Sequence, residues 1–194
     1  MDIDFSVTKN GKELDKSLYT WDENSKTFST CENGLVLDFI SVNGCTFKTG
    51  GDCTFKTGFG CTFKTDDCCT FKTGFGCTFK TGCGCTYNTG YDCTFDTGYD
   101  CTFDTGGDCT FKTDDDCTFK TGDYCTFNTG YDCTFDTGHN CTFDTGYDCT
   151  FDTGDCCTFK TDDYCTFKTG EECVAVRRGI FEIIKLEKGV KIKI

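Results

Sequence analysis

Residues 93–108 read CTFDTGYDCTFDTGGD, which is two consecutive copies of an eight-residue unit. The unit occurs sixteen times between residues 45 and 172 without insertion or deletion, as Cys-Thr-Phe-(Lys, Asp or Asn)-Thr-Gly-x-x. We number its positions one to eight. A unit this short cannot bury its own apolar side chains and becomes stable only by stacking on copies of itself. The period therefore predicts an all-β fold, a β-solenoid of sixteen octapeptide repeats.

Each unit is predicted to form a short strand followed by a turn. The alternation within positions one to five directs Cys, Phe and the second Thr inward, and directs the first Thr and the fourth residue outward. Position six is Gly in thirteen units and Asp66, Asp114 or Asp162 in the others. We expect this position to adopt a positive φ, which Gly tolerates best. The second Thr is expected to hydrogen-bond the turn backbone.

The number of units in one coil is a separate question. Eight residues of ~3.3 Å each make a loop too tight to close around a Phe ring, whereas two units place facing strands ~10 Å apart. Stacking like charges at position four also disfavours one unit per coil, but it does not separate two units from three. We predict two, with three as the alternative.

The ends of the chain depart from the repeat and are predicted to be β caps, giving segments 1–44, 45–172 and 173–194. In the first cap, strands at 27–30 and 35–42 should cover the first open coil. In the last cap, strands at 181–186 and 190–194 should form a hairpin.

The chain has twenty-one cysteines, and seventeen of them occupy position one of the repeat. This arrangement and the odd total favour buried free thiols rather than disulfides. Oxidation along the ladder remains an alternative, and the spacing disfavours zinc. Cys68, Cys83 and Cys156 occupy turn positions and are the predicted exposed thiols. The sequence contains no membrane-spanning apolar run and no signal peptide, so we expect a cytoplasmic protein or a component of a virus or other particle.

A possible interaction stripe is suggested by six aromatic residues that share position seven, namely Phe59, Phe75, Tyr91, Tyr99, Tyr131 and Tyr147. His139 is the only histidine and is interpreted as a solvated turn residue. The sequence suggests no catalytic residue, metal ligand, cofactor or small-molecule substrate. Aspartates in the turns leave calcium binding as a weaker alternative.

The unit shares features with several repeat proteins. The outward Thr row resembles flat insect antifreeze solenoids, although a Lys, Asp or Asn lies beside each Thr here. An inward small residue and Phe two apart resemble the pentapeptide-repeat proteins, some of which are acidic rods that mimic DNA. The CTFKTG and CTFNTG units are most similar to uncharacterised cysteine-rich octapeptide-repeat proteins of large DNA viruses and bacteria, a resemblance that implies a β-solenoid and no assigned activity.

These features predict a non-catalytic rigid rod with a structural or protein-interaction role. A net charge of −13 makes an acidic DNA-mimic binding module the main alternative. Ice binding and calcium binding are weaker alternatives. The expected partners are another protein or a second copy, without direct nucleic-acid or membrane binding.

Overall fold

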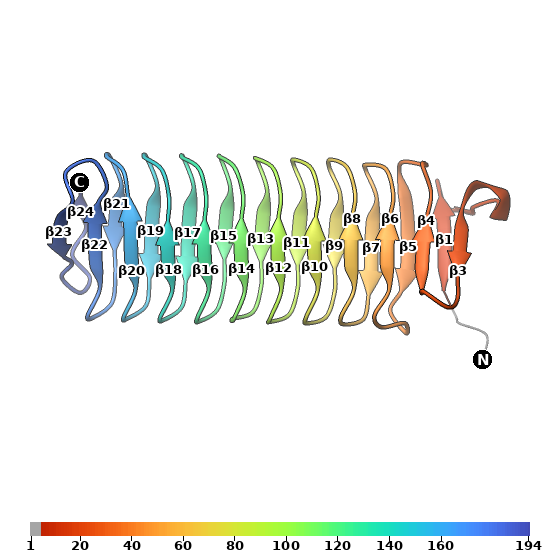
Figure 1. The fold of residues 1–194 in the computed structure, drawn as a ribbon, viewed down its shortest axis with the longest axis horizontal. Coiled ribbons are helices and arrows are strands. Elements are labelled where there is room, and N and C mark those ends of the chain that lie inside the picture. Colours follow the sequence, from red (N-terminus) through yellow and green to blue (C-terminus); the bar gives the residue numbers. More distant parts are fainter. Residues whose placement is uncertain (1–4) are drawn as a thin grey trace.

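The protein is a straight, flattened rod in which two parallel β-sheets face each other (Figure 1). The structure is a computed structural model that describes residues 5–194. The chain crosses from one sheet to the other after every octapeptide, and Thr78 is in register with Thr94 and Phe79 with Phe95. Paired residues are thus two units apart. The predicted β-solenoid with two units per coil is confirmed, and the three-unit alternative is wrong.

Each sheet contains 12 strands. Sheet A runs, in spatial order, through β2 (Lys12–Glu13), β1 (Ser6–Lys9), β5 (Leu35–Phe39), β7 (Thr54–Thr57), β9 (Thr70–Lys72), β11 (Thr86–Asn88), β13 (Thr102–Asp104), β15 (Thr118–Lys120), β17 (Thr134–Thr137), β19 (Thr150–Thr153), β21 (Thr166–Lys168) and β24 (Ile192–Lys193). Sheet B runs through β23 (Glu182–Lys185), β22 (Val174–Arg177), β20 (Thr158–Thr161), β18 (Thr142–Asp144), β16 (Thr126–Asn128), β14 (Thr110–Lys112), β12 (Thr94–Asp96), β10 (Thr78–Lys80), β8 (Thr62–Lys64), β6 (Thr46–Lys48), β4 (Thr27–Ser29) and β3 (Thr20–Asp22). A single 3-10 turn, η1 (Lys16–Leu18), is the only helical segment of the described residues.

The aromatic rings of position three fill the space between the sheets. Phe95 and Phe111, on neighbouring strands of sheet B, stack with centroids 4.8 Å apart. Phe103 of sheet A meets Phe111 edge to face, with centroids 5.2 Å apart and planes at 78°. Both arrangements are favourable for aromatic quadrupoles. Two stacked columns therefore interlock along the rod, as the inward direction of position three predicts.

The position-one cysteines lie beside these columns as buried free thiols. The Cys109 Sγ donates to the carbonyl oxygens of Gly107 (3.3 Å) and Gly90 (3.8 Å), which belong to successive coils. None of the twenty-one cysteines, all of which lie within the described residues 5–194, forms a disulfide, and those at position one are buried. Contact with neighbouring thiols, followed by burial, raises the pKa of Cys109 far above the ordinary thiol range. The predicted thiol ladder is confirmed.

The second Thr of the unit also faces inward, at the start of each turn. The Thr105 Oγ1 donates to the Gly106 carbonyl oxygen at 3.1 Å, and Thr113 makes the same bond to Asp114 at 3.2 Å. Both threonines are buried. A hydroxyl that bonds the next carbonyl satisfies a polar group at the core boundary, as the sequence predicts for most units. The hydroxyls of Thr129, Thr137 and Thr161 lack such a partner among the described residues.

The positive φ lies at position eight, so the expectation for position six is wrong. Gly76 (64°), Asp92 (60°) and Tyr124 (59°) all occupy position eight. Glycine is favoured at position six for a different reason, because the backbones of successive coils approach each other closely there. A Cβ on Gly122 would lie 2.8 Å from the Gly107 nitrogen of the coil below.

The N-terminal segment joins the solenoid and then covers it. Strands β4 and β5 pair in parallel with β6 and β7, so the predicted strands at 27–30 and 35–42 form the first coil rather than a cover. The cover comes from β1 and β2 on sheet A and β3 on sheet B, which pair antiparallel. Phe5 stacks on Phe39 at 4.3 Å and seals the core beneath this cover.

The C-terminal cap also differs from the prediction. Strand β22 continues the parallel stacking on β20, and β23 folds back antiparallel on β22. Strand β24 instead pairs antiparallel with β21 of the other sheet. The predicted hairpin between 181–186 and 190–194 is therefore wrong, because each strand closes the exposed edge of a different sheet.

Candidate functional site

The rod offers two flat faces and two long turn edges as candidate sites. Positions two and four project from the faces, whereas positions seven and eight lie in the turns. We call the edge where the chain leaves sheet B the B–A edge and the edge where it leaves sheet A the A–B edge. No helix among the described residues has the length and apolar character needed to cross a bilayer.

The six predicted stripe residues do not form one stripe. Phe59, Phe75 and Tyr91 lie on the A–B edge and stack in order, with centroids 4.9 and 5.1 Å apart. The other three, Tyr99, Tyr131 and Tyr147, follow strands of sheet B and lie on the B–A edge. The single stripe is therefore corrected to two aromatic groups on opposite edges, because consecutive turns alternate between the edges.

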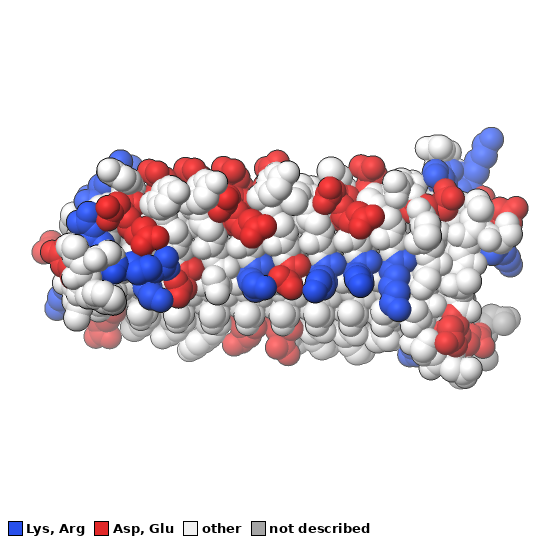
Figure 2. Space-filling model, turned by 45° about the horizontal axis from the view of Figure 1, so that its top comes forward, with Lys and Arg blue, Asp and Glu red and all other residues white. Residues whose placement is uncertain are grey.

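The B–A edge group is itself interrupted. Tyr131 and Tyr147 stack at 5.2 Å, but Asp115 occupies the turn between Tyr99 and Tyr131. Figure 2 shows this edge, where acidic clusters alternate with uncharged side chains. The sequence interpretation also omitted Tyr124 and Tyr164, which project from position eight and are 61% and 62% exposed.

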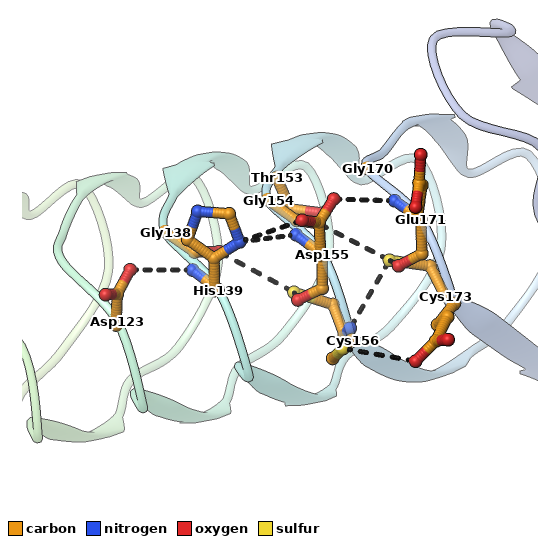
Figure 3. Close-up of polar contacts among 12 residues, drawn as sticks. Asp123, Gly138, His139, Thr153, Gly154, Asp155, Cys156, Gly170, Glu171 and Cys173 are labelled. Atoms are coloured by element: carbon orange, nitrogen blue, oxygen red, sulfur yellow. Dashed lines mark hydrogen bonds and ion pairs between the residues drawn. The ribbon is translucent and has the colours of Figure 1, made fainter.

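Polar side chains at position seven link the turns of successive coils. On the A–B edge, the Asp123 carboxylate accepts from the His139 backbone N–H at 2.8 Å, and the Asp155 carboxylate accepts from the Glu171 backbone N–H at 2.7 Å (Figure 3). On the B–A edge, Asp115 bonds the Tyr131 backbone N–H in the same way at 3.1 Å. These carboxylates are used in holding the turns together.

His139 is a member of this series, since its Nδ1 accepts from the Asp155 backbone N–H at 2.9 Å (Figure 3). The same Nδ1 lies 3.5 Å from the Asp155 carboxylate. The Nδ1 atom can accept the hydrogen bond from the Asp155 backbone N–H only when it carries no proton. The imidazole can form an ion pair with the Asp155 carboxylate only when it is protonated. The imidazole is exposed, in agreement with its interpretation as a turn residue.

The turn carboxylates do not converge on a metal. Among residues 5–194, no group of three or more Asp, Glu, His or Cys side chains could hold a metal ion. The expected weakness of calcium binding stays a prediction. The outward Thr row also lies beside a charged row on each face, which differs from the uniform Thr surfaces of the antifreeze solenoids.

The three predicted turn thiols differ in exposure. Cys68 and Cys156 are exposed, and Cys83 is half-buried. Cys31 is also exposed. It was not singled out from the sequence because it precedes the repeats and therefore has no position in the unit. Partial desolvation, followed by nearby carboxylates, raises the pKa of Cys68 and Cys156.

Treating the folded protein with iodoacetamide near neutral pH should alkylate Cys31, Cys68 and Cys156, with slower reaction at Cys83. The seventeen buried thiols should react only after denaturation, because their side chains are shielded from the reagent within the core. Because the pKa of Cys68 and Cys156 is raised, their alkylation should accelerate as the pH rises from neutrality.

Intact-protein mass spectrometry counts the adducts, and peptide mapping assigns them. The control is the same reaction in guanidinium chloride, where every cysteine should be modified. Native protein that gains more than four adducts before unfolding would contradict the buried thiol ladder.

The fourth-position row over sheet B combines lysines with a few aspartates. Asp96 lies 4.0 Å from Lys80 and 3.5 Å from Lys112. Asp144 lies 3.0 Å from Lys160 and also contacts Arg178. Figure 2 shows this row, with consecutive basic side chains toward the N-terminal end. The aspartates of this face are thus already paired within the chain.

An open groove of about 780 Å³ runs beside the same row. Lys48, Lys64 and Lys80 line it together with Cys31 and Asp67. The lining combines lysines of the repeat with Ser29 and Thr30 from before the repeat and with the buried Thr49 and Thr65. The groove is open to solvent along the rod.

The C-terminal cap supplies two arginines that were not singled out from the sequence. Arg178 contacts Asp144 and lies 3.1 Å from Asp162, so it bridges two coils. Arg177 lies 2.6 Å from Asp163, and this hydrogen bond lowers the pKa of the Asp163 carboxyl. The arginines attach the cap to the acidic end of the rod.

Comparison of the chain with protein-family models, curated proteins and solved structures found no match.

Proposed function

We propose that the protein is a non-catalytic rigid rod that acts by presenting repeated surfaces to another protein or to a second copy of itself. The observation that carries the proposal is the continuous aromatic core. Stacked rings such as Phe111 and Phe127, 4.8 Å apart, recur in both sheets along the whole repeat. Such a core supports a stiff scaffold on which exposed groups keep fixed spacing.

The surface supplies the features that interaction needs. Exposed aromatic side chains are enriched at protein interfaces because they bury much area with little loss of conformational freedom. Phe75 and Tyr147 are 40% and 46% exposed and project from opposite edges. The flat faces between the edges carry ordered charges. The rod can therefore contact partners on several sides without changing shape.

The acidic DNA-mimic alternative has less support from the arrangement of charge. The larger acidic clusters around Asp67, Asp115 and Asp163 recur on the B–A edge every third coil, which is ~14 Å at strand spacing, and single aspartates such as Asp100 and Asp132 lie in the turns between them. Duplex DNA carries a phosphate every ~3.4 Å along each strand. Lysine rows also interrupt the acidic surface, so the charge pattern favours contacts with mixed-charge protein surfaces.

A photo-crosslinking residue placed at Phe75 or at Tyr147 tests the interaction role in cells of the source. We expect crosslinks to a discrete protein, or to a second copy, identified by mass spectrometry. The matched control is the same residue at buried Phe111, which should give only internal crosslinks.

The proposal would be overturned by the absence of crosslinks at every exposed position of a correctly folded rod. Capture of a DNA-binding protein that DNA displaces would favour the mimic instead.

A further inference from the structure

The outward charged row over sheet A has an order that distinguishes it from the row over sheet B. We call it the sheet A row. The register of the strands places its members one above another along the rod in the order Asp38, Lys56, Lys72, Asn88, Asp104, Lys120, Asp136, Asp152 and Lys168.

The sheet A row is complementary to its own reverse. A lysine doublet, Lys56 and Lys72, lies on one side of the central Asp104, and an aspartate doublet, Asp136 and Asp152, lies at the matching distance on the other side. Neighbouring strands are ~4.8 Å apart. Within each doublet, like charges therefore face each other across adjacent strands and repel.

Most of these charges have no partner within the described part of the chain, residues 5–194. The only ion pair in the sheet A row joins Lys168 to Asp152 at 2.6 Å. On sheet B, by contrast, the aspartates Asp96 and Asp144 are each paired with two basic groups. Only the sheet A row leaves both signs available for a second molecule.

We propose that a second copy of this chain docks face to face on sheet A with its rod axis reversed. A two-fold axis through the Asp104 strand, parallel to the strands, places the sheet A row of one copy over that of the other. Lys72 then faces Asp136 and Lys56 faces Asp152. Each contact occurs twice, because a two-fold interface is self-complementary.

Of the remaining members of the row, two pairs are compatible with this alignment and one residue opposes it. Asp38 faces Lys168 and Asn88 faces Lys120, and again each contact occurs twice. Asp104 alone faces its own copy, on the two-fold axis, and this single like-charge contact opposes association. The threonines of position two lie in a parallel row on the same face, so that small β-branched side chains meet one another and permit close approach.

Other alignments are poorer. A slip by one strand in one direction places Lys72 over Lys120 and Asp38 over Asp152. A slip in the other direction places Lys56 over Lys168. With the two rods pointing the same way, every member of the row faces its own copy. The charge order therefore selects one orientation and one register, which is how electrostatics specifies an interface.

The available area is sufficient for a weak, specific dimer. The nine strands from β5 to β21 span roughly 38 Å along the rod, and most of the strand segments are roughly 10–13 Å long. Because most of these strands have three or four residues, contact over this face buries roughly 800–1,000 Å² in total, the size of a weak, transient interface. This inference rests on the proposed interaction role and names a partner and a face for it.

Sedimentation equilibrium of the purified full chain tests the dimer directly. We expect dimers at about 50 mM NaCl and at least about tenfold weaker association at about 1 M NaCl, because salt screens exposed charge pairs. Chains that stay monomeric at high concentration in low salt would overturn the proposal. The crosslinking test of the proposed function would be unaffected, because it also detects other proteins.

Charge reversal identifies the face. Lys72→Glu and Asp136→Lys should each weaken the dimer at least about tenfold, since each variant creates two like-charge contacts. The double variant should recover association, and an equimolar mixture of the two single variants should form a heterodimer. Lys64→Glu is the matched control, because Lys64 is an exposed fourth-position lysine on sheet B and the change in net charge is the same.

Circular dichroism establishes that each variant is folded. Loss of association in Lys64→Glu as large as in Lys72→Glu would place the contact elsewhere and overturn the proposal. A dimer unaffected by Lys72→Glu would overturn it as well.

Discussion

Replacing Phe111 by Ala is expected to lower the free energy of unfolding by about 3–5 kcal/mol, the range for removing a buried aromatic side chain. Phe111 is 0% exposed. It stacks on Phe95 and Phe127, both at 4.8 Å, and meets Phe103 and Phe119 edge to face at 5.2 and 5.3 Å. The truncation leaves a cavity that neighbouring coils cannot fill, because their backbones are held by the sheets. Guanidinium denaturation followed by circular dichroism measures the loss.

Phe75→Ala is the matched control, since Phe75 is also stacked on both sides but lies on the A–B edge. Its centroids are 4.9 Å from Phe59 and 5.1 Å from Tyr91, and it is 40% exposed. We expect a loss of about 0.5–1.5 kcal/mol, the contribution of aromatic contact without full burial. Equal losses in the two variants would show that stacking rather than burial stabilises the core.

The second large effect is expected from Gly122→Ala in a turn of the A–B edge. The Gly122 backbone N–H donates to the Gly106 carbonyl oxygen of the adjacent coil at 3.2 Å. An added Cβ would lie 2.8 Å from the Gly107 nitrogen, and backbone atoms cannot move aside as a flexible side chain can. The coils must separate locally, and we expect a loss of about 1–3 kcal/mol, measured by the same denaturation.

Asp114→Ala is the control for this position, because Asp114 occupies position six with a Cβ already present. Its coil has accommodated the side chain, and no hydrogen bond from the Asp114 backbone N–H to the Gly98 carbonyl oxygen occurs among the described residues. Its carboxylate is exposed, so we expect a change within about 0.5 kcal/mol. A Gly122→Ala protein as stable as the parent would refute the close-approach role of position six.

Much of the fold could be predicted because the unit contains few conflicting signals. Alternation of apolar and polar residues assigned Cys109 and Phe111 to the core, and ring size excluded a one-unit coil. The assignment of positive φ failed because Gly and Asp occur at positions six and eight alike. The requirement for glycine at position six comes from contacts between coils, such as that of Gly122 with Gly107, and a single unit does not contain them.

The candidate surfaces were less accessible to sequence reasoning. Alternate turns lie on opposite edges, so Tyr91 and Tyr99, which are adjacent in the series of turns, are separated by the rod. The C-terminal strands were assigned to each other because they are consecutive, whereas open sheet edges at β21 and β22 offered better partners. Pairings between distant segments, including Arg178 with Asp144, depend on where each coil ends.

The sequence by itself determined the octapeptide period, the inward ladder of Cys and Phe, and the stacked parallel sheets, because these follow from local alternation and from the inability of one unit to bury its side chains. Only the tertiary structure decided which exposed groups share an edge or a face. The coil length of two units sorts the fourth position into two rows. In one row the aspartates are paired internally, and the other, centred on Asp104, is complementary to its own reverse. The two rows differ because residues sixteen apart in the sequence become neighbours along each sheet.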